Sequence, residues 1–167
     1  MSIPLIINKN KIINDPIYGF ISIEHPIIFD LIAHPYFQRL RRIKQLGLTD
    51  LVYPGAVHNR FTHALGATHL MGLAIKDLRL KNVKISDEEY EAASIAILLH
   101  DIGHGPYSHA LEFSLFDNIT HEDLSLALMN RMNDEFRGKL DMAIKIFTGE
   151  YPKHFLHQLV SSQLDVD

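Results

Sequence analysis

The side chains best suited to chemistry in this 167-residue chain stand at the end of its most apolar segment. The run AILLHDIGHGPYSH at residues 96–109 places His100, Asp101, His104 and His109 directly after aliphatic residues. His100 and His104 are four residues apart, which puts them on one face of a helix. Imidazole and carboxylate groups without thiolate suit a divalent ion such as Mn, Fe, Ni, Zn or Mg. The pattern therefore predicts one divalent metal ion, held at the tip of a rigid, buried helix.

A purely structural role is the alternative interpretation, because single histidines at helix ends often only hydrogen-bond to backbone carbonyls. The chain has eleven histidines, however, and seven of them lie between His58 and His121. This clustering favours one common site. His63 follows the helix-capping residue Asn59 by about one turn, and a pair of antiparallel helices would bring it to the same place. His69, two turns later, is interpreted as structural.

A guanidinium group also lies near these candidate ligands. Arg60 precedes His63 by three residues, so both side chains project from the first turn of one helix. Guanidinium groups bind phosphate in a bidentate manner, which predicts a phosphate-binding role for Arg60. The basic run RLRRIK at residues 39–44 is instead interpreted as a solvated face, at Arg39 and Lys44 in particular.

The composition is that of a soluble globular protein, with 47% hydrophobic and 22% charged residues. A net charge of −4 excludes a global basic field for nonspecific nucleic-acid binding, although a specific nucleic-acid contact stays open. The absence of cysteine excludes disulfides and zinc–thiolate sites. The longest uncharged apolar run, residues 92–99, is far too short to cross a bilayer. We expect a cytoplasmic protein that does not bind a membrane.

Hydrophobic periodicity predicts an all-α fold with a small N-terminal β element. Residues 5–23 are rich in β-branched residues and carry turn signals at Asn14-Asp15-Pro16 and at Gly19, which is typical of short strands. Ser86 and Glu89 form a capping box that begins a helix. Apolar residues at helical spacing predict helices over residues 26–34, 36–47, 60–80, 88–102, 121–136, 139–147 and 153–164.

No linker or repeat divides the chain, so we expect a single domain over residues 1–167. Short strands would occupy residues 1–25 and a helical core residues 26–167. The chain ends in SSQLDVD, which we interpret as an interruption, and we expect the N-terminal part of a longer protein. The final aspartates, Asp165 and Asp167, are either a solvated tail or the source of a carboxylate that completes the metal's coordination.

The order of His63, then His100-Asp101, then a later aspartate resembles the H…HD…D signature of the HD-domain metal-dependent phosphohydrolases. The blocks NDPIYGFI, HPYFQRLRRIKQLG, YPGAVHNRFTHALG, HDIGHGPYSHALE, THE and DVD are similar to the branch that contains the deoxynucleoside triphosphate triphosphohydrolases. The resemblance spans residue 14 to the last residue. It implies the HD-domain helical fold, a nucleotide substrate and a homo-oligomer.

The resemblance also implies roles for individual residues. The implied metal ligands are His63, His100, Asp101 and Asp167. The implied catalytic residues near the phosphates are His104, His109, Glu112 and His121. Glu112 stands where the branch usually has an aspartate that orients a catalytic histidine, so the carboxylate is kept on a longer arm. Gln45 resembles the residue at the 3′-hydroxyl of the sugar, and Arg60 resembles the residue that holds phosphate.

A second nucleotide site is implied by the same resemblance. Asn14, Gln38 and Arg41 resemble parts of an activator-nucleotide site in the regulated members of the branch. The carboxylate that reads guanine in that site falls at Ala33 here, and a methyl group cannot accept those hydrogen bonds. We therefore do not expect guanine-specific activation.

The leading functional hypothesis is metal-dependent hydrolysis of a dNTP to deoxynucleoside and triphosphate. A different phosphohydrolase with the same metal site is the first alternative, for example a phosphomonoesterase or a cyclic or alarmone nucleotide hydrolase. A nonenzymatic nucleotide-binding regulatory module is the second. Release of triphosphate distinguishes the leading hypothesis from both.

Overall fold

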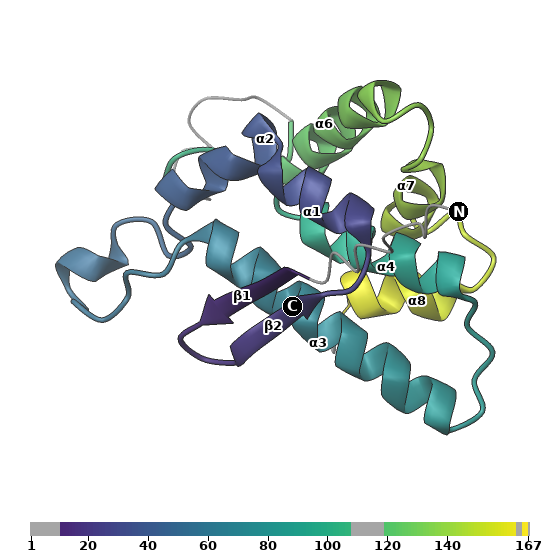
Figure 1. The fold of residues 1–167 in the computed structure, drawn as a ribbon. Helices are drawn as coiled ribbons and strands as arrows, with labels where there is room; N and C mark the ends of the chain where they lie inside the picture. Colours follow the sequence, from purple (N-terminus) through teal and green to yellow (C-terminus); the bar gives the residue numbers. More distant parts are fainter. Residues whose placement is uncertain (1–10, 108–118, 163–164, 167) are drawn as a thin grey trace, which may run out of the picture.

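The computed structural model describes residues 11–107, 119–162, 165 and 166, and within them the chain is mostly helical with one two-stranded sheet (Figure 1). The predicted fold class, all-α with a small N-terminal β element, is confirmed. Three of the predicted site residues, His109, Glu112 and Asp167, lie outside the described residues. None of the helices in the described ranges combines the length and apolar character that a bilayer span requires.

The sheet is a hairpin in which β1 (Lys11–Asp15) pairs antiparallel with β2 (Gly19–Ile23). Its turn is held by Asp15, whose carboxylate accepts hydrogen bonds from the backbone amides of Ile17 and Tyr18 at 2.8 and 3.0 Å. Gly19 completes the turn with a φ of 71°, a left-handed conformation that favours glycine. Alternation along β2 then directs Ile21 and Ile23 into the core.

After α1 (Pro26–Ala33), the chain differs from the prediction of one helix over residues 36–47. It forms a single turn, α2 (Pro35–Gln38), then a 3-10 turn, η1 (Arg39–Arg42), and becomes extended at Ile43. The physical reason is tertiary pairing, because the Ile43 carbonyl accepts from the Arg60 amide at 2.9 Å and the Gln45 amide donates to His58 at 3.1 Å. A second 3-10 turn, η2 (Thr49–Leu51), follows.

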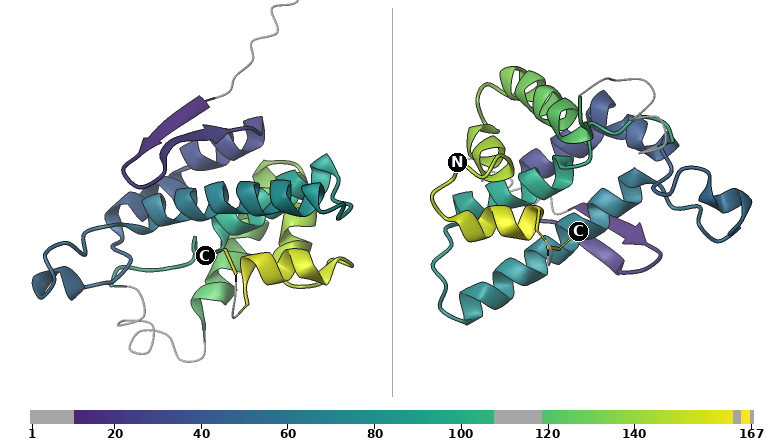
Figure 2. Two further views of the ribbon diagram at one scale, coloured as in Figure 1. Left: turned by 90° about the horizontal axis from the view of Figure 1, so that it is seen from below. Right: turned by 180° about the vertical axis from the view of Figure 1, so that it is seen from behind.

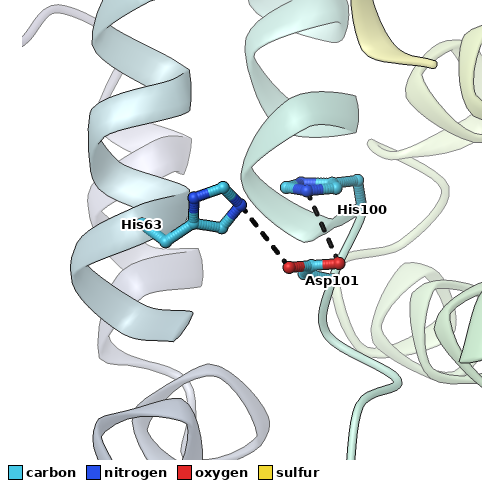
Figure 3. Close-up of side chains that lie close together, drawn as sticks. All are labelled: His63, His100 and Asp101. Carbon is cyan, nitrogen blue, oxygen red and sulfur yellow. Dashed lines mark ion pairs between the residues drawn. The ribbon is translucent and has the colours of Figure 1, made fainter. Parts of the chain in front are cut away.

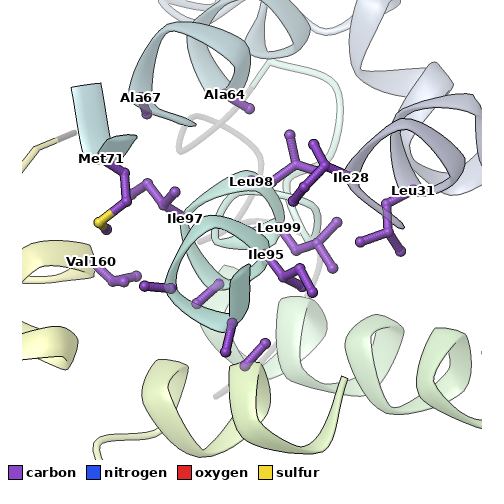
Figure 4. Packing of buried hydrophobic residues seen from close by; sticks show 14 of the residues in the cluster. Ile28, Leu31, Ala64, Ala67, Met71, Ile95, Ile97, Leu98, Leu99 and Val160 are labelled. Carbon is purple, nitrogen blue, oxygen red and sulfur yellow. The ribbon is translucent and has the colours of Figure 1, made fainter. Parts of the chain in front are cut away.

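Two helices form the centre of the molecule. α3 (Arg60–Leu80) begins at the Asn59 cap and α4 (Asp87–Leu99) at the Ser86–Glu89 capping box, both as predicted. The second half of α4 is apolar on every side and is covered by α1, α3, α7 and α8 (Figure 4). Such all-round burial makes α4 a fixed support for the residues at its C-terminal end.

Three further helices complete the described structure: α6 (His121–Glu135), α7 (Asp141–Phe147) and α8 (His154–Val160). Thr120 caps α6, and its hydroxyl and Asp123 form a second capping box. α8 ends at Val160, earlier than the predicted residue 164. The hairpin lies on one side of α3 and α8 on the other (Figure 2, left).

Glu89 ties the beginning of α4 to the segment between α7 and α8. Its carboxylate accepts hydrogen bonds from the Ser86 amide at 2.8 Å, the Tyr151 hydroxyl at 2.8 Å and the Lys153 ammonium at 2.7 Å. Burial raises the pKa of this carboxyl, but the hydrogen bonds from Lys153, Ser86 and Tyr151 outweigh it. The pKa of Glu89 therefore lies below its ordinary value of 4.5.

We expect Glu89→Gln to lower the free energy of unfolding by about 2 kcal/mol at pH 7, because it removes the charge that these donors share. Because the pKa of Glu89 is lowered in the folded protein, its charged form stabilises the fold fully above the ordinary pKa. This stabilisation is lost as the pH falls through the folded pKa. The difference between parent and variant should therefore shrink below pH 4.5. Urea denaturation at several pH values measures it, with the exposed Glu150→Gln as control. A difference that is the same at pH 3.5 and pH 7 would contradict the assignment.

Candidate metal centre

The candidate site forms where the first turn of α3 lies beside the C-terminal end of α4 (Figure 3). Asn59 fixes the start of α3, because its side-chain oxygen accepts from the Thr62 amide at 3.0 Å. His63 projects from this first turn. α4 ends at Leu99, before the predicted residue 102, so His100 and Asp101 stand in the turn that follows the helix.

The side chains of His63, His100 and Asp101 converge. One donor atom from each lies within 4.8 Å of the other two. Nε2 of His63 is 3.6 Å from one Asp101 carboxylate oxygen, and Nε2 of His100 is 3.5 Å from the other. The structure thus brings together two imidazoles and one carboxylate from separate segments of the chain, which the sequence predicts as metal ligands.

The orientation of His100 suits metal binding. Its Nδ1 lies 2.6 Å from the carbonyl oxygen of Ile97. A carbonyl only accepts, so Nδ1 carries the proton, and in the neutral ring Nε2 presents its lone pair toward Asp101. A hydrogen bond from the ring nitrogen that does not bind the metal, here Nδ1, is typical of histidines that ligate metals. Imidazole and carboxylate groups without thiolate fit a divalent cation, so the three residues could hold one.

Asp101 is shared with a second group of histidines. Its carboxylate lies 3.2 Å from Nε2 of His104, whose ring stacks on that of His121 with centroids 4.0 Å apart. Donor atoms of Asp101, His104 and His121 also lie within 4.8 Å of one another. The site is therefore two histidine clusters joined by one carboxylate, and His121 enters it from the first residue of α6.

Charge and burial set the protonation of this carboxylate. Asp101 is 5% exposed, and Arg60 forms an ion pair with it. Burial alone would raise the pKa of Asp101, but the hydrogen bond from His104 and the charge of Arg60 hold it well below its ordinary value. Burial also lowers the pKa of His104, partly opposed by Asp101. Asp101 is thus an anion at neutral pH, as a metal ligand must be.

The two residues predicted to contact substrate, Arg60 and Gln45, lie at the start of α3 and beside the segment before it. Arg60 is only 3% exposed, and its guanidinium donates to Asp101 and does not face open solvent. Gln45 lies in the extended segment that runs beside the start of α3, where its amide bonds to His58. Gln45 thus lies beside the segment that leads into α3, and Arg60 is the first residue of that helix.

The predicted activator residues lie together in a separate cavity of about 400 Å³. Asn14 comes from β1, Gln38 from α2 and Arg41 from η1. The Arg41 guanidinium donates to the Gln38 side-chain oxygen at 2.8 Å and lies 3.6 Å above the ring of Phe61. Ala33 is also in the lining. The residues thus share one cavity although they come from three elements.

Two residues that contact the site were missed or misjudged from the sequence. The interpretation of Arg39 as part of a solvated face is wrong, because its guanidinium donates to the carbonyls of Ile102 and His104. Ser125, on α6, bonds to the same turn. Its position four residues after His121, on the same helix face, is a signal that could have identified it. Lys44, by contrast, is exposed as expected and pairs with Asp50.

Comparison with known proteins agrees with this geometry. The family model described as "HD domain" matches residues 60–147, which include both central helices. The crystal structure of a phosphohydrolase from Bacteroides thetaiotaomicron superposes with a TM-score of 0.92 at 57% sequence identity, over 95% of this chain and 39% of that one. The predicted HD-domain helical fold is therefore confirmed.

Curated relatives match at lower identity. YwfO of Bacillus subtilis, described as uncharacterized, is 34% identical over 96% of this chain and 38% of its own length. The deoxynucleoside triphosphate triphosphohydrolase SAMHD1 is 48% identical in Danio rerio and 46% in Homo sapiens, over 61% and 64% of this chain. The chain spans 17% of the length of each of these two proteins.

Proposed function

Because the chain belongs to the HD-domain family, we propose that it is a metal-dependent phosphohydrolase that acts on nucleotides. The observation that carries the proposal is the convergence of His63, His100 and Asp101, whose donor atoms lie within 4.8 Å of one another. The second histidine cluster strengthens it, since it adds proton-carrying groups beside the ligand carboxylate.

The residues have distinct parts in this proposal. A divalent ion held by His63, His100 and Asp101, with Asp167 as the proposed fourth ligand, would polarise a phosphate oxygen and help to activate water. Arg60 already lies against the ligand carboxylate, so its guanidinium is within reach of a phosphate that shares the ion. His104 and His121, with His109 and Glu112, are the candidates for moving protons between water and the leaving oxygen.

Within this class we propose a dNTP as substrate. Hydrolysis would bond the oxygen of water to the α-phosphorus and break its bond to the 5′-oxygen, which takes up a proton and leaves as deoxynucleoside, with triphosphate as the second product. The similarity to SAMHD1 over about three fifths of this chain supports this choice. The proposed contacts of Gln45 with the sugar and of Arg60 with the phosphates fit the same substrate.

The test is a panel of dNTPs, rNTPs, phosphomonoesters and cyclic nucleotides, assayed with added Mn²⁺ and with product analysis. Triphosphate release from a dNTP is the expected result. Inorganic phosphate or a nucleoside monophosphate as product would instead support another phosphohydrolase. Binding of nucleotide without turnover would support the regulatory-module alternative.

The remaining expectations stay part of the proposal. We propose that residues 1–167 form one domain, that copies of the protein assemble into a homo-oligomer, and that a nucleotide binds the cavity that contains Asn14, Gln38 and Arg41. The guanidinium of Arg41 supplies a phosphate-binding group there. Light scattering with and without nucleotide measures the assembly.

We expect His63→Ala to lower bound Mn²⁺ at least tenfold and to abolish turnover, because it removes one of three converging donors. His63 is partly exposed in the first turn of α3, so the free energy of unfolding of the metal-free protein should change by less than about 1 kcal/mol. Metal analysis and urea denaturation measure both. His69→Ala, two turns along α3 with its ring 5.3 Å from that of Tyr18, is the control and should keep the metal. Full metal content in His63→Ala would refute the assignment.

A further inference from the structure

The turn that carries the candidate ligands is held by side chains from two other elements. After α4 ends, residues 100–104 follow a tight path in which the Ile102 amide donates to Leu99 at 3.0 Å and the His104 amide to Asp101 at 3.2 Å. The carbonyls at the end of a helix lack helical partners and need donors from elsewhere. The source of these donors decides how firmly the turn, and with it Asp101, is fixed.

Arg39 supplies donors from one side. One guanidinium nitrogen donates to the His104 carbonyl at 2.7 Å, and the other to the carbonyl of Ile102. Burial lowers the pKa of this guanidinium from its ordinary value. A planar group with two donors in fixed geometry can hold two carbonyls at a set separation, which a single ammonium cannot do. Arg39 thus links η1 to the backbone that directly follows Asp101.

Ser125 holds the same turn from α6. Its hydroxyl donates to the His100 carbonyl at 2.7 Å and accepts from the Gly103 amide at 2.8 Å. The residue is fully buried in α6. One hydroxyl therefore bridges the backbone on both sides of Asp101, and it does so from the helix that begins with His121.

We propose that Arg39 and Ser125 are positioning residues that lock the backbone of residues 100–104, so that Asp101 and His104 meet His63 and His121. The inference rests on the proposed function, because it concerns the same metal centre. Neither residue touches substrate or metal in this role. Their effect passes through the carbonyls and amide that they hold.

The test compares Arg39→Ala and Arg39→Lys with Arg42→Ala, in which an exposed arginine of the same 3-10 turn is removed. Mn²⁺ affinity is measured by titration, and kcat and KM are measured with the substrate that the panel of nucleotides identifies. Loss of an outer partner of a metal ligand weakens binding or activity by about 10- to 100-fold. We expect a loss of this size in Arg39→Ala, mainly in Mn²⁺ affinity and kcat, a partial recovery in Arg39→Lys, and parent values in Arg42→Ala.

The Mn²⁺ titration keeps this inference separate from the proposed function. If the parent binds Mn²⁺ but hydrolyses no nucleotide, the proposed function fails while the comparison of affinities still stands. Parent affinity in a folded Arg39→Ala overturns the inference, and so does an equal loss in Arg42→Ala. Should Arg39→Ala fail to fold, Ser125→Ala decides the matter. It should lose Mn²⁺ affinity, and parent affinity there would overturn the inference.

Discussion

Gly103→Ala is expected to lower the free energy of unfolding by at least about 3 kcal/mol and to remove bound metal, because no space exists for a methyl group. A Cβ at this position would lie 2.8 Å from the Ser125 hydroxyl oxygen, and nearer still to the His121 carbonyl oxygen and the Ser125 amide nitrogen. Two of these atoms, the His121 carbonyl oxygen and the Ser125 amide nitrogen, belong to the backbone of α6 and cannot move by a side-chain rotation. The turn after Asp101 and the start of α6 must separate, and His121 moves with α6.

Gly105→Ala is the matched control for this prediction. It lies two residues further along the same segment, and an added Cβ there meets no atom of the described structure within 4 Å. Its stability and metal content should stay close to those of the parent. Urea denaturation and metal analysis of both variants make the comparison. Equal behaviour of the two alanines would show that close packing of the turn against α6 does not hold the site together.

The convergence of His63 with His100 and Asp101 was predictable because its signals are local in the sequence. Two helix starts are marked in the sequence, by a cap at Asn59 and a capping box at Ser86. The apolar run that follows Ser86 leads directly to His100 and Asp101. Since His63 follows one helix start and His100 follows the other helix end, an antiparallel pair is enough to bring them together. The hydrophobic pattern thus determines both the core and the meeting point of the ligands.

The parts that sequence reasoning missed depend on contacts between distant segments. Residues 36–47 have a helical pattern. The backbone of Ile43 and Gln45, however, bonds to residues 60 and 58 at the start of α3, and this pairing ends the helix early. The same 3-10 turn directs Arg39 toward the carbonyls of the turn at residues 100–104, which a regular helix facing solvent would not do. No periodicity in a single segment encodes such a partner. Arg60 is similar, because its burial against Asp101 follows only from the way α3 and α4 pack.

Asp101→Asn is expected to abolish Mn²⁺ binding and to destabilise the protein by about 3–5 kcal/mol even without metal. The first effect follows from losing the only carboxylate in the described ligand set. The second follows from Arg60, which is 3% exposed and pairs with the Asp101 carboxylate. An amide of the same shape removes the negative charge of this ion pair from beside the buried guanidinium. Urea denaturation in EDTA measures the second effect alone, because no metal then stabilises the parent.

A double variant separates the two roles of Asp101. Arg60→Met removes the guanidinium that pairs with Asp101 and keeps a side chain of similar length, so adding it to Asp101→Asn should restore most of the stability in EDTA. It should restore neither Mn²⁺ binding nor turnover, because the ligand carboxylate is still absent. If the double variant is no more stable than Asp101→Asn, the loss does not come from the buried arginine. If it binds Mn²⁺ like the parent, Asp101 is not a metal ligand, and the histidines must bind the ion without it.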